Sequence, residues 1–288
     1  MNQLNLFIEL TRIKKPIGFM LLFWPCIWGL TLVYDFNSSL NNYFFFGSLF
    51  LAGSILMRSA GCIVNDIVDK NFDKKVERTK NRPIASGKIS VKVALIYSIV
   101  LCGLAFLVLI NFNKFTIYMA LLSMPLAFTY PLMKRITYWP QLFLGITFNY
   151  GLVLAWISIS NEVSLVTLVF YFGAIFWTLG YDTIYGFQDI KDDEIIGVKS
   201  TSIKFKDGPK KFLLLCYLVF VVSLIFVGMN MNFKLFYFMF LIIPTAQLFI
   251  FQIKNLNISD INDCLAKFKS NNLLGLIVLI NIFVGKLI

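Results

Sequence analysis

Two acid-rich stretches contain the residues that are best suited to chemistry. Their polar side chains are spaced as they would be on one face of a helix: Asn65, Asp66, Asp69 and Asp73 in the first, and Asp182, Tyr185, Asp189 and Asp193 in the second. Each stretch follows an apolar segment and leads into a loop rich in Lys and Arg. Two carboxylate clusters beside many cations are typical of sites that bind a diphosphate together with Mg²⁺. Because a carboxylate at the edge of a bilayer is costly unless it is paired or coordinated, we interpret both stretches as functional.

The first stretch is expected to line one face of a helix. Since residues of a helix turn by about 100° each, four side chains would share about 80° of the surface, with Asp66 at the edge: Arg58, Asn65, Asp69 and Asp73. Arg58 would lie about 10 Å deeper in the membrane than Asn65. One or two carboxylates per ion suffice for Mg²⁺, so Asn65, Asp66, Asp69 and Asp73 are candidate ligands. The alternative is a solvated helix end paired with neighbouring lysines.

The second stretch contains two candidate metal ligands and one deeper carboxylate. Asp182 would lie about 16 Å along the helix axis from Asp193, too far to share an ion, so we assign only Asp189 and Asp193 to metal. The depth of Asp182 matches that of Arg58, and two interpretations remain open. The two side chains could form a buried ion pair. Alternatively, Arg58 could bind a substrate carboxylate while Asp182, with Tyr185, positions an acceptor hydroxyl or accepts a proton.

The basic loops supply candidate phosphate contacts. Arg78 and Arg82 follow the first stretch, Lys134 and Arg135 lie in a short turn, and Lys199 follows the second stretch. Arginine suits bidentate contact with phosphate oxygens. These cations could equally orient the chain in the membrane or bind lipid headgroups. The residues predicted to act in catalysis are Asp66, Asp69, Asp182 and Asp189.

The composition predicts an all-α membrane protein. Hydrophobic residues make up 58% of the 288 residues, charged residues 14%, and the mean hydropathy is +0.77. Nine apolar segments are long enough to span a bilayer: 16–34, 43–64, 91–111, 115–133, 139–158, 164–186, 212–230, 235–253 and 272–288. We expect one membrane domain over residues 1–288, with loops at 65–92, 131–139, 190–211 and 254–271.

Basic residues predict the orientation of these spans. Of 26 Lys and Arg residues, 22 lie on the side of the N-terminus, Arg58 lies within the second span, and three lie on the opposite side: Lys114, Lys234 and Lys286. By the positive-inside rule the N-terminus and both acidic stretches are cytoplasmic. We expect a bacterial plasma membrane rather than a mitochondrial inner membrane. Since the basic residues follow the loops of one face, membrane lipids are the expected partners and nucleic acid is not.

The scarcity of other reactive side chains limits the reactions and metal sites that the chain could support. The sequence has no histidine, which excludes imidazole ligands and a histidine general base. Its five cysteines show no paired spacing, so neither a disulfide framework nor a thiolate metal site is indicated. The offset of 120 residues from Asp69 to Asp189 suggests two four-helix halves in parallel orientation, followed by a ninth helix.

Several segments resemble a known family. Met57–Asp69, with Asp73 and the run Glu77–Pro83, resembles the first signature of the UbiA-type intramembrane aromatic prenyltransferases, and Gly180–Tyr185 through Asp193 to Lys199-Ser200-Thr201 resembles the second. The leader Arg12–Gly18 and the turn at Tyr130-Pro131 look like the subgroup that acts on 4-hydroxybenzoate. The likeness covers about residues 10 to 205, and the number of spans extends it to the whole chain.

The resemblance implies nine helices around a central cavity and Mg²⁺ at the two acidic stretches. It implies transfer of a polyprenyl group from polyprenyl diphosphate to the ring of 4-hydroxybenzoate, ortho to the hydroxyl, in ubiquinone synthesis. Arg12 and Lys15 of the leader would then join the diphosphate contacts. Two alternatives remain: a relative with another acceptor, such as homogentisate or haem, and a cation-coupled transporter. Transporter sites usually lie near the bilayer midplane, whereas these carboxylates lie at helix ends.

Overall fold

Helices make up the regular secondary structure of residues 3–77 and 79–288, which are the residues that the computed structural model describes. Eight helical segments of this part of the chain are long and apolar enough to cross a membrane, and the 17-residue apolar helix α2 (Ile17–Val33) makes nine. The all-α class and the nine spans are therefore confirmed. The other spans are α3 (Leu40–Val68), α5 (Val91–Leu109), α6 (Lys114–Thr129), α8 (Pro140–Ser160), α9 (Leu165–Gly186), α12 (Pro209–Asn230), the run α13–α14–η2 (Leu235–Phe240, Ile242–Ala246, Gln247–Lys254) and α15 (Ile261–Leu287).

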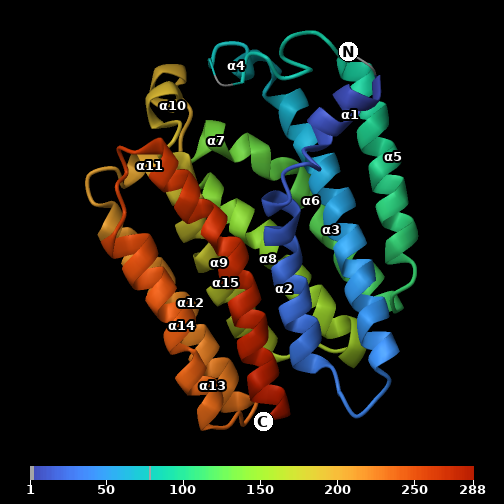
Figure 1. Cartoon of the computed structure of the whole chain (residues 1–288). Coiled ribbons are helices and arrows are strands. Elements are labelled where there is room, and N and C mark those ends of the chain that lie inside the picture. The colour runs from blue at the N-terminus through green and yellow to red at the C-terminus, as the bar shows by residue number, and fades with distance from the viewer. Residues whose placement is uncertain (1–2, 78) are drawn as a thin grey trace.

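The remaining short helices gather at one end of the bundle. They are α1 (Gln3–Thr11), α4 (Lys70–Asp73), η1 (Tyr130–Leu132), α7 (Met133–Ile136), α10 (Ile190–Ile196) and α11 (Thr201–Lys204). Figure 1 shows α4, α7, α10 and α11 at the end of the molecule that holds the N-terminus, with the C-terminus at the opposite end. Both acidic stretches thus lie at the same end, as expected for motifs that follow even-numbered spans.

Buried aromatic rings pack together where α2, α9 and α12 meet. Trp28 on α2 lies 5.0 Å from Trp177 on α9 and 6.1 Å from Phe220 on α12, measured between ring centroids. All three side chains are buried. Their apolar area stabilises the contact of α2, α9 and α12, and the tilted ring pairs add to it.

Helices from opposite ends of the chain, α2 and α15, close the bundle. The indole N–H of Trp28 donates to the carbonyl oxygen of Gly275 at 2.9 Å, and that of Trp24 donates to Asn272 Oδ1 at 2.9 Å. Buried indole groups need such acceptors. Gly275 is required here, because a Cβ atom at this position would lie 2.4 Å from the Trp24 ring.

The ninth span begins earlier than predicted. It starts at Ile261 rather than at residue 272, and its first turns contain Asp263 and Lys267. Lys267 is only 2% exposed because its ammonium pairs with Asp263 one turn earlier and lies 5.0 Å from the Phe251 ring centroid. A hydropathy window counts both charges against a helix in the membrane, although pairing removes most of their cost.

Candidate active site

The first acidic stretch is interrupted at Asp69. This residue ends α3 and begins α4, with φ −91° and ψ 3°, outside the helical region. Its N–H still donates to the carbonyl of Asn65 at 2.9 Å, and its own carbonyl accepts from the N–H of Asp73 at 2.8 Å. The expectation of one continuous helix is therefore wrong. The chain turns at Asp69, which moves Asp73 onto a separate short helix beside the end of α3.

Three carboxylates of this stretch are buried at the turn. Asp66 is 2% exposed, Asp69 1% and Asp73 7%, while the Asn65 side chain is half-buried. The alternative of a solvated helix end is therefore wrong for these three carboxylates. Buried carboxylates need nearby positive charge, since an unpaired one would cost several kcal/mol.

Cations from distant segments supply this charge. Arg82 Nη1 lies 3.1 Å from Asp66 Oδ1 and 2.9 Å from Asp73 Oδ2, so one guanidinium joins two carboxylates. Arg12 also pairs with Asp66. Burial lowers the pKa of the Arg12 guanidinium, but the Asp66 carboxylate and other nearby groups together offset this, so the pKa lies above its ordinary value. Arg12 therefore stays charged at any physiological pH.

The turn before α8 completes the cluster. Lys134 forms an ion pair with Asp69, and Arg135 Nη2 lies 3.7 Å from Asp69 Oδ1. Lys15 is exposed and makes no ion pair with the acidic residues that the structure describes. Arg78, a predicted phosphate contact, lies outside the described residues. The structure therefore brings together Arg12, Arg82, Lys134 and Arg135 around the first stretch.

The first stretch fits a divalent cation that is shared with phosphate, although it is not a complete cage. Asp69 Oδ1 is buried without a hydrogen-bond partner, which is the condition of an oxygen available to a metal ion. Within the described residues no three acidic, His or Cys side chains are grouped closely enough to hold an ion by themselves. Mg²⁺ rarely uses such a cage and commonly takes one or two carboxylates together with waters and substrate phosphates.

The second stretch is interrupted in the same way. Helix α9 ends at Gly186 and α10 begins at Ile190, with Asp189 between them at φ −114° and ψ 2°. The expectation that Asp182, Asp189 and Asp193 share one continuous helical face is therefore wrong. Asp189 and Asp69 adopt nearly the same backbone conformation at equivalent positions of the two stretches. At both residues the chain turns because it leaves the bundle there and runs along its end.

A chain of contacts links the two stretches. The N–H of Lys199 donates to the carbonyl of Lys134 at 2.7 Å, and Lys199 Nζ donates to the carbonyl of Ile136 at 3.2 Å. The N–H of Thr201 donates to Gln141 Oε1 at 3.0 Å, and its hydroxyl lies 2.6 Å from that of Thr183 on α9. Lys134, which pairs with Asp69, is thereby connected to the helix that ends in the second stretch.

Sequence reasoning missed the residues that make this connection. Gln141, Thr183 and Ser202 are buried, and the Ser202 hydroxyl donates to the carbonyl of Thr183 at 2.8 Å. Gly186 permits that approach, since a Cβ there would lie 2.2 Å from Ser202 Oγ. In the sequence, these residues are recognisable only as polar side chains near the ends of apolar spans. That pattern does not show which partners they contact.

Arg58 and Asp182 lie near one another without forming a direct ion pair. Their charges interact electrostatically across α3 and α9, but no contact within 4.0 Å joins them among the ion pairs of the described residues. Arg58 also interacts electrostatically with Tyr130 and Tyr185. The Tyr185 ring packs 4.4 Å from that of Phe268 on α15, measured between centroids. The structure therefore brings the three predicted acceptor-binding residues, Arg58, Asp182 and Tyr185, to the same region.

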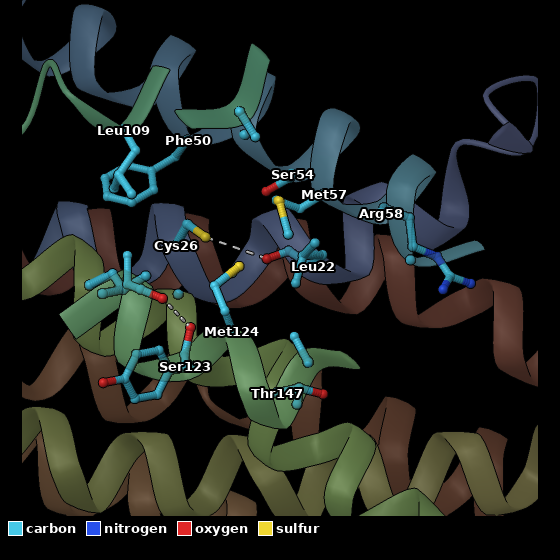
Figure 2. Close-up of a pocket in the computed structure, with 18 of the residues that line it drawn as sticks. Leu22, Cys26, Phe50, Ser54, Met57, Arg58, Leu109, Ser123, Met124 and Thr147 are labelled. Carbon is cyan, nitrogen blue, oxygen red and sulfur yellow. Dashed lines mark hydrogen bonds between the residues drawn. The ribbon is translucent and has the colours of Figure 1, made fainter. Parts of the chain in front are cut away.

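An apolar cavity of about 370 Å³ extends away from Arg58. Helices α2, α3, α5, α6 and α8 line it, with aromatic side chains along its length: Phe50, Phe106, Phe112, Phe128, Phe148 and Tyr150. Figure 2 shows Arg58 at one end of this pocket and Phe50 and Leu109 at the other. Arg12 interacts electrostatically with both Asp66 and Arg58, so the charged cluster lies next to the Arg58 end. The site thus combines a cationic and acidic end with a long apolar compartment.

Comparison with known proteins agrees with this arrangement. The sequence matches the UbiA prenyltransferase family over residues 22–276. The 4-hydroxybenzoate polyprenyltransferase, mitochondrial, of Rattus norvegicus is 43% identical over 282 residues, which are 98% of this chain and 75% of that protein. The apo structure of a UbiA homolog from Aeropyrum pernix K1 superposes with a TM-score of 0.74 at 22% identity, covering 93% of this chain and 97% of that one. A UbiA homolog from Archaeoglobus fulgidus bound to GPP and Mg²⁺ gives a TM-score of 0.68 at 17% identity, covering 98% and 100%.

These relatives correct the expected location. The proteins from rat, cattle, nematode and human are named as mitochondrial. The expectation of a bacterial plasma membrane is therefore wrong, and the relatives point to a mitochondrial membrane instead. The error has a physical origin, because the distribution of basic residues reports orientation across a bilayer and not the identity of that bilayer.

The sequence match covers most of the chain. It agrees with the fold, with the paired acidic stretches and with the apolar cavity. The chain belongs to the UbiA prenyltransferase family.

Proposed function

We propose that this chain, acting as one membrane domain, transfers a polyprenyl group from polyprenyl diphosphate to 4-hydroxybenzoate. The new bond forms at the ring carbon ortho to the hydroxyl, and the product is 3-polyprenyl-4-hydroxybenzoate. The main supporting observation is that the apolar cavity ends at Arg58, beside the cluster of buried carboxylates and cations. A prenyl diphosphate needs such a pair of adjoining compartments, one for its charged head and one for its apolar chain. The similarity to 4-hydroxybenzoate polyprenyltransferases supports the choice of acceptor.

The diphosphate head would bind at the two acidic stretches. The side chains that we assign to Mg²⁺ are Asn65, Asp66, Asp69, Asp73, Asp189 and Asp193. When bound, Mg²⁺ would neutralise the charge that builds on the diphosphate as the allylic C–O bond breaks. The cations that now pair with the carboxylates would turn to phosphate oxygens: Arg12, Arg82, Lys134 and Arg135, joined by Lys15, Arg78 and Lys199. These cations stabilise the transition state, since negative charge develops on the diphosphate as the C–O bond breaks.

Among these residues, Asp66, Asp69 and Asp189 are proposed as essential to catalysis. Asp66 and Asp69 are buried and paired with cations at the first stretch. Asp189 lies at the equivalent turn of the second stretch. The two stretches therefore position positive charge around the diphosphate from two different sides.

The acceptor would bind between α3 and α9. Arg58 receives its carboxylate, and Tyr185 packs near the ring. Asp182 lies within electrostatic reach of Arg58 and is proposed to orient the phenol hydroxyl and to accept a proton once the ring has been alkylated. The ring carbon ortho to that hydroxyl is electron-rich and attacks the allylic carbon.

The isoprenoid chain would occupy the cavity in Figure 2. Its apolar lining excludes water, which would otherwise compete with the ring for the allylic carbon. The faces of aromatic rings in the lining, such as Phe148 beside Arg58, would favour positive charge on that carbon.

The test uses purified protein in lipid vesicles with polyprenyl diphosphate, Mg²⁺ and a panel of acceptors. Mass spectrometry should detect prenylated 4-hydroxybenzoate, and chelation with EDTA should abolish its formation. Homogentisate and haem serve as competing acceptors. Product from either of these, without product from 4-hydroxybenzoate, would contradict the proposed acceptor while leaving the prenyl transfer intact.

A further inference from the structure

The guanidinium of Arg58 lies against the backbone of Gly18, near the start of α2. A methyl group at the Cβ position of residue 18 would lie 2.9 Å from Arg58 Nε, 3.5 Å from Nη2 and 3.6 Å from Cζ. The distance to Nε is too short for a Cβ contact, whereas the other two are ordinary van der Waals contacts, so a side chain at residue 18 would displace the guanidinium at Nε. Gly18 lies inside a helix at an ordinary backbone conformation. Its missing side chain therefore serves to admit Arg58 and not to permit an unusual turn.

Phe148 contacts the same guanidinium from another helix. Arg58 Cζ lies 5.4 Å from the centroid of the Phe148 ring, within the range of a cation–π contact. The three residues come from α2, α3 and α8, and α2 packs against both of the other helices. Arginine loses considerable rotational freedom when it is held in one conformation. Contacts with both α2 and α8 reduce the number of side-chain conformations that Arg58 can adopt before the acceptor binds.

We propose that Gly18 is a positioning residue that makes the site selective for an acceptor with a carboxylate. This inference rests on the proposed function, in which Arg58 binds that carboxylate. A guanidinium binds a carboxylate through two parallel N–H groups, so its plane must have one orientation. Gly18 provides the space for that orientation, and Phe148 keeps the guanidinium in it. A side chain at residue 18 would displace the guanidinium while leaving the paired carboxylates at the end of α3 in place.

The experiment compares two acceptors in the wild type and in Gly18→Ala. The first acceptor is 4-hydroxybenzoate and the second is its neutral amide, 4-hydroxybenzamide, which has no carboxylate to meet Arg58. We expect Gly18→Ala to raise the KM for 4-hydroxybenzoate about ten- to a hundredfold, since small displacements of a binding group have effects of this size. The KM for polyprenyl diphosphate and the kinetics with the amide should stay within about twofold of wild type.

Two further variants separate positioning from structure. Phe148→Leu removes the ring contact without adding bulk, and it should also lower the preference for the acid over the amide. In Arg58→Leu the preference should disappear, and adding Gly18→Ala to that variant should have no further effect on it. Gly103→Ala is the matched control, because a Cβ at this exposed position of α5 meets nothing within 4 Å. It should change neither acceptor preference nor thermal stability.

The proposal would be overturned if Gly18→Ala left the preference for 4-hydroxybenzoate over the amide unchanged. This holds whether the kinetics with both acceptors stay normal or decline by the same factor. Phe148→Leu decides the question independently if Gly18→Ala does not fold: an unchanged acid preference there would also count against it. Failure of the proposed function has a different signature. In that case the wild type does not prenylate 4-hydroxybenzoate, or Arg58→Leu keeps the wild-type preference for the acid.

Discussion

The carbonyl oxygen of Lys134 accepts a hydrogen bond of 2.7 Å from the backbone N–H of Lys199. The Lys134 ammonium forms the ion pair with Asp69 in the first acidic stretch, and Lys199 precedes the residues that are anchored to α9, where the second stretch begins. The contact thereby connects the two proposed halves of the diphosphate site through backbone atoms. A side-chain substitution at residue 134 removes the charge and leaves this connection intact.

Lys134→Met should therefore impair diphosphate binding and leave the fold in place. Asp69 would lose its closest counter-charge among the described residues, and Arg135 at 3.7 Å would remain as its ion-pair partner there. We expect kcat/KM for polyprenyl diphosphate to fall about ten- to a hundredfold, the effect of losing one charge-assisted contact of about 1.5–3 kcal/mol. Steady-state kinetics with each substrate measures this. The control Lys206→Met breaks the exposed pair with Glu194, and its kinetics should match those of wild type. Equal losses in both variants would contradict a specific role for Lys134.

Each acidic stretch should be required separately. Asp69→Ala and Asp189→Ala should each abolish prenyl transfer, because the two stretches hold different parts of the diphosphate and its metal ions. Activity assays in membranes, with insertion checked by protease protection, measure this. Glu77→Gln is the control, since Glu77 is 84% exposed, lies in the same loop as Arg82 and pairs only with Lys80 among the described residues. Near-normal turnover in either Asp variant, or in EDTA, is incompatible with the two-stretch mechanism.

Arg58→Leu tests the acceptor assignment. The KM for 4-hydroxybenzoate should rise about ten- to a hundredfold through loss of a charge-assisted contact, while binding of polyprenyl diphosphate stays nearly intact. Titration of folded protein with each substrate measures the two affinities. The double variant Arg58→Leu/Asp182→Asn distinguishes the alternative of a structural pair. Recovery of acceptor binding in the double variant would show that Arg58 mainly neutralises Asp182, and our carboxylate assignment would then fail.

The basic loops should share one side of the membrane. Cysteines introduced at Lys80 and Lys206 should react with an impermeant thiol reagent from the same face, and one introduced at Lys234 should react only from the opposite face. The physical reason is the bias of 22 basic residues toward the face of the N-terminus, out of 26 in the chain. Inverted and right-side-out vesicles provide the two faces. Labelling of all three positions from one face would contradict the arrangement of the spans.

The sequence determined the spans and the end of the bundle at which chemistry takes place. Apolar runs of sufficient length must form helices in a bilayer, since no water is available to satisfy the backbone there. The number of spans between Asp69 and Asp189 then places both stretches at one end, which the structure confirms. The family signatures could also be recognised from the residues alone, and the sequence match confirms the family.

Only the tertiary structure decided which side chains meet. Arg12 is 54 residues from its partner Asp66, and Lys134 is 65 residues from Asp69, distances over which periodicity carries no information. The turns at Asp69 and Asp189 were equally hidden, because a helical pattern continues across them in the sequence. Packing decided the role of Gly18 as well. A glycine in an apolar helix has many explanations, and the contact with Arg58 exists only because α2 and α3 approach closely enough for one residue to fill the space that the other leaves.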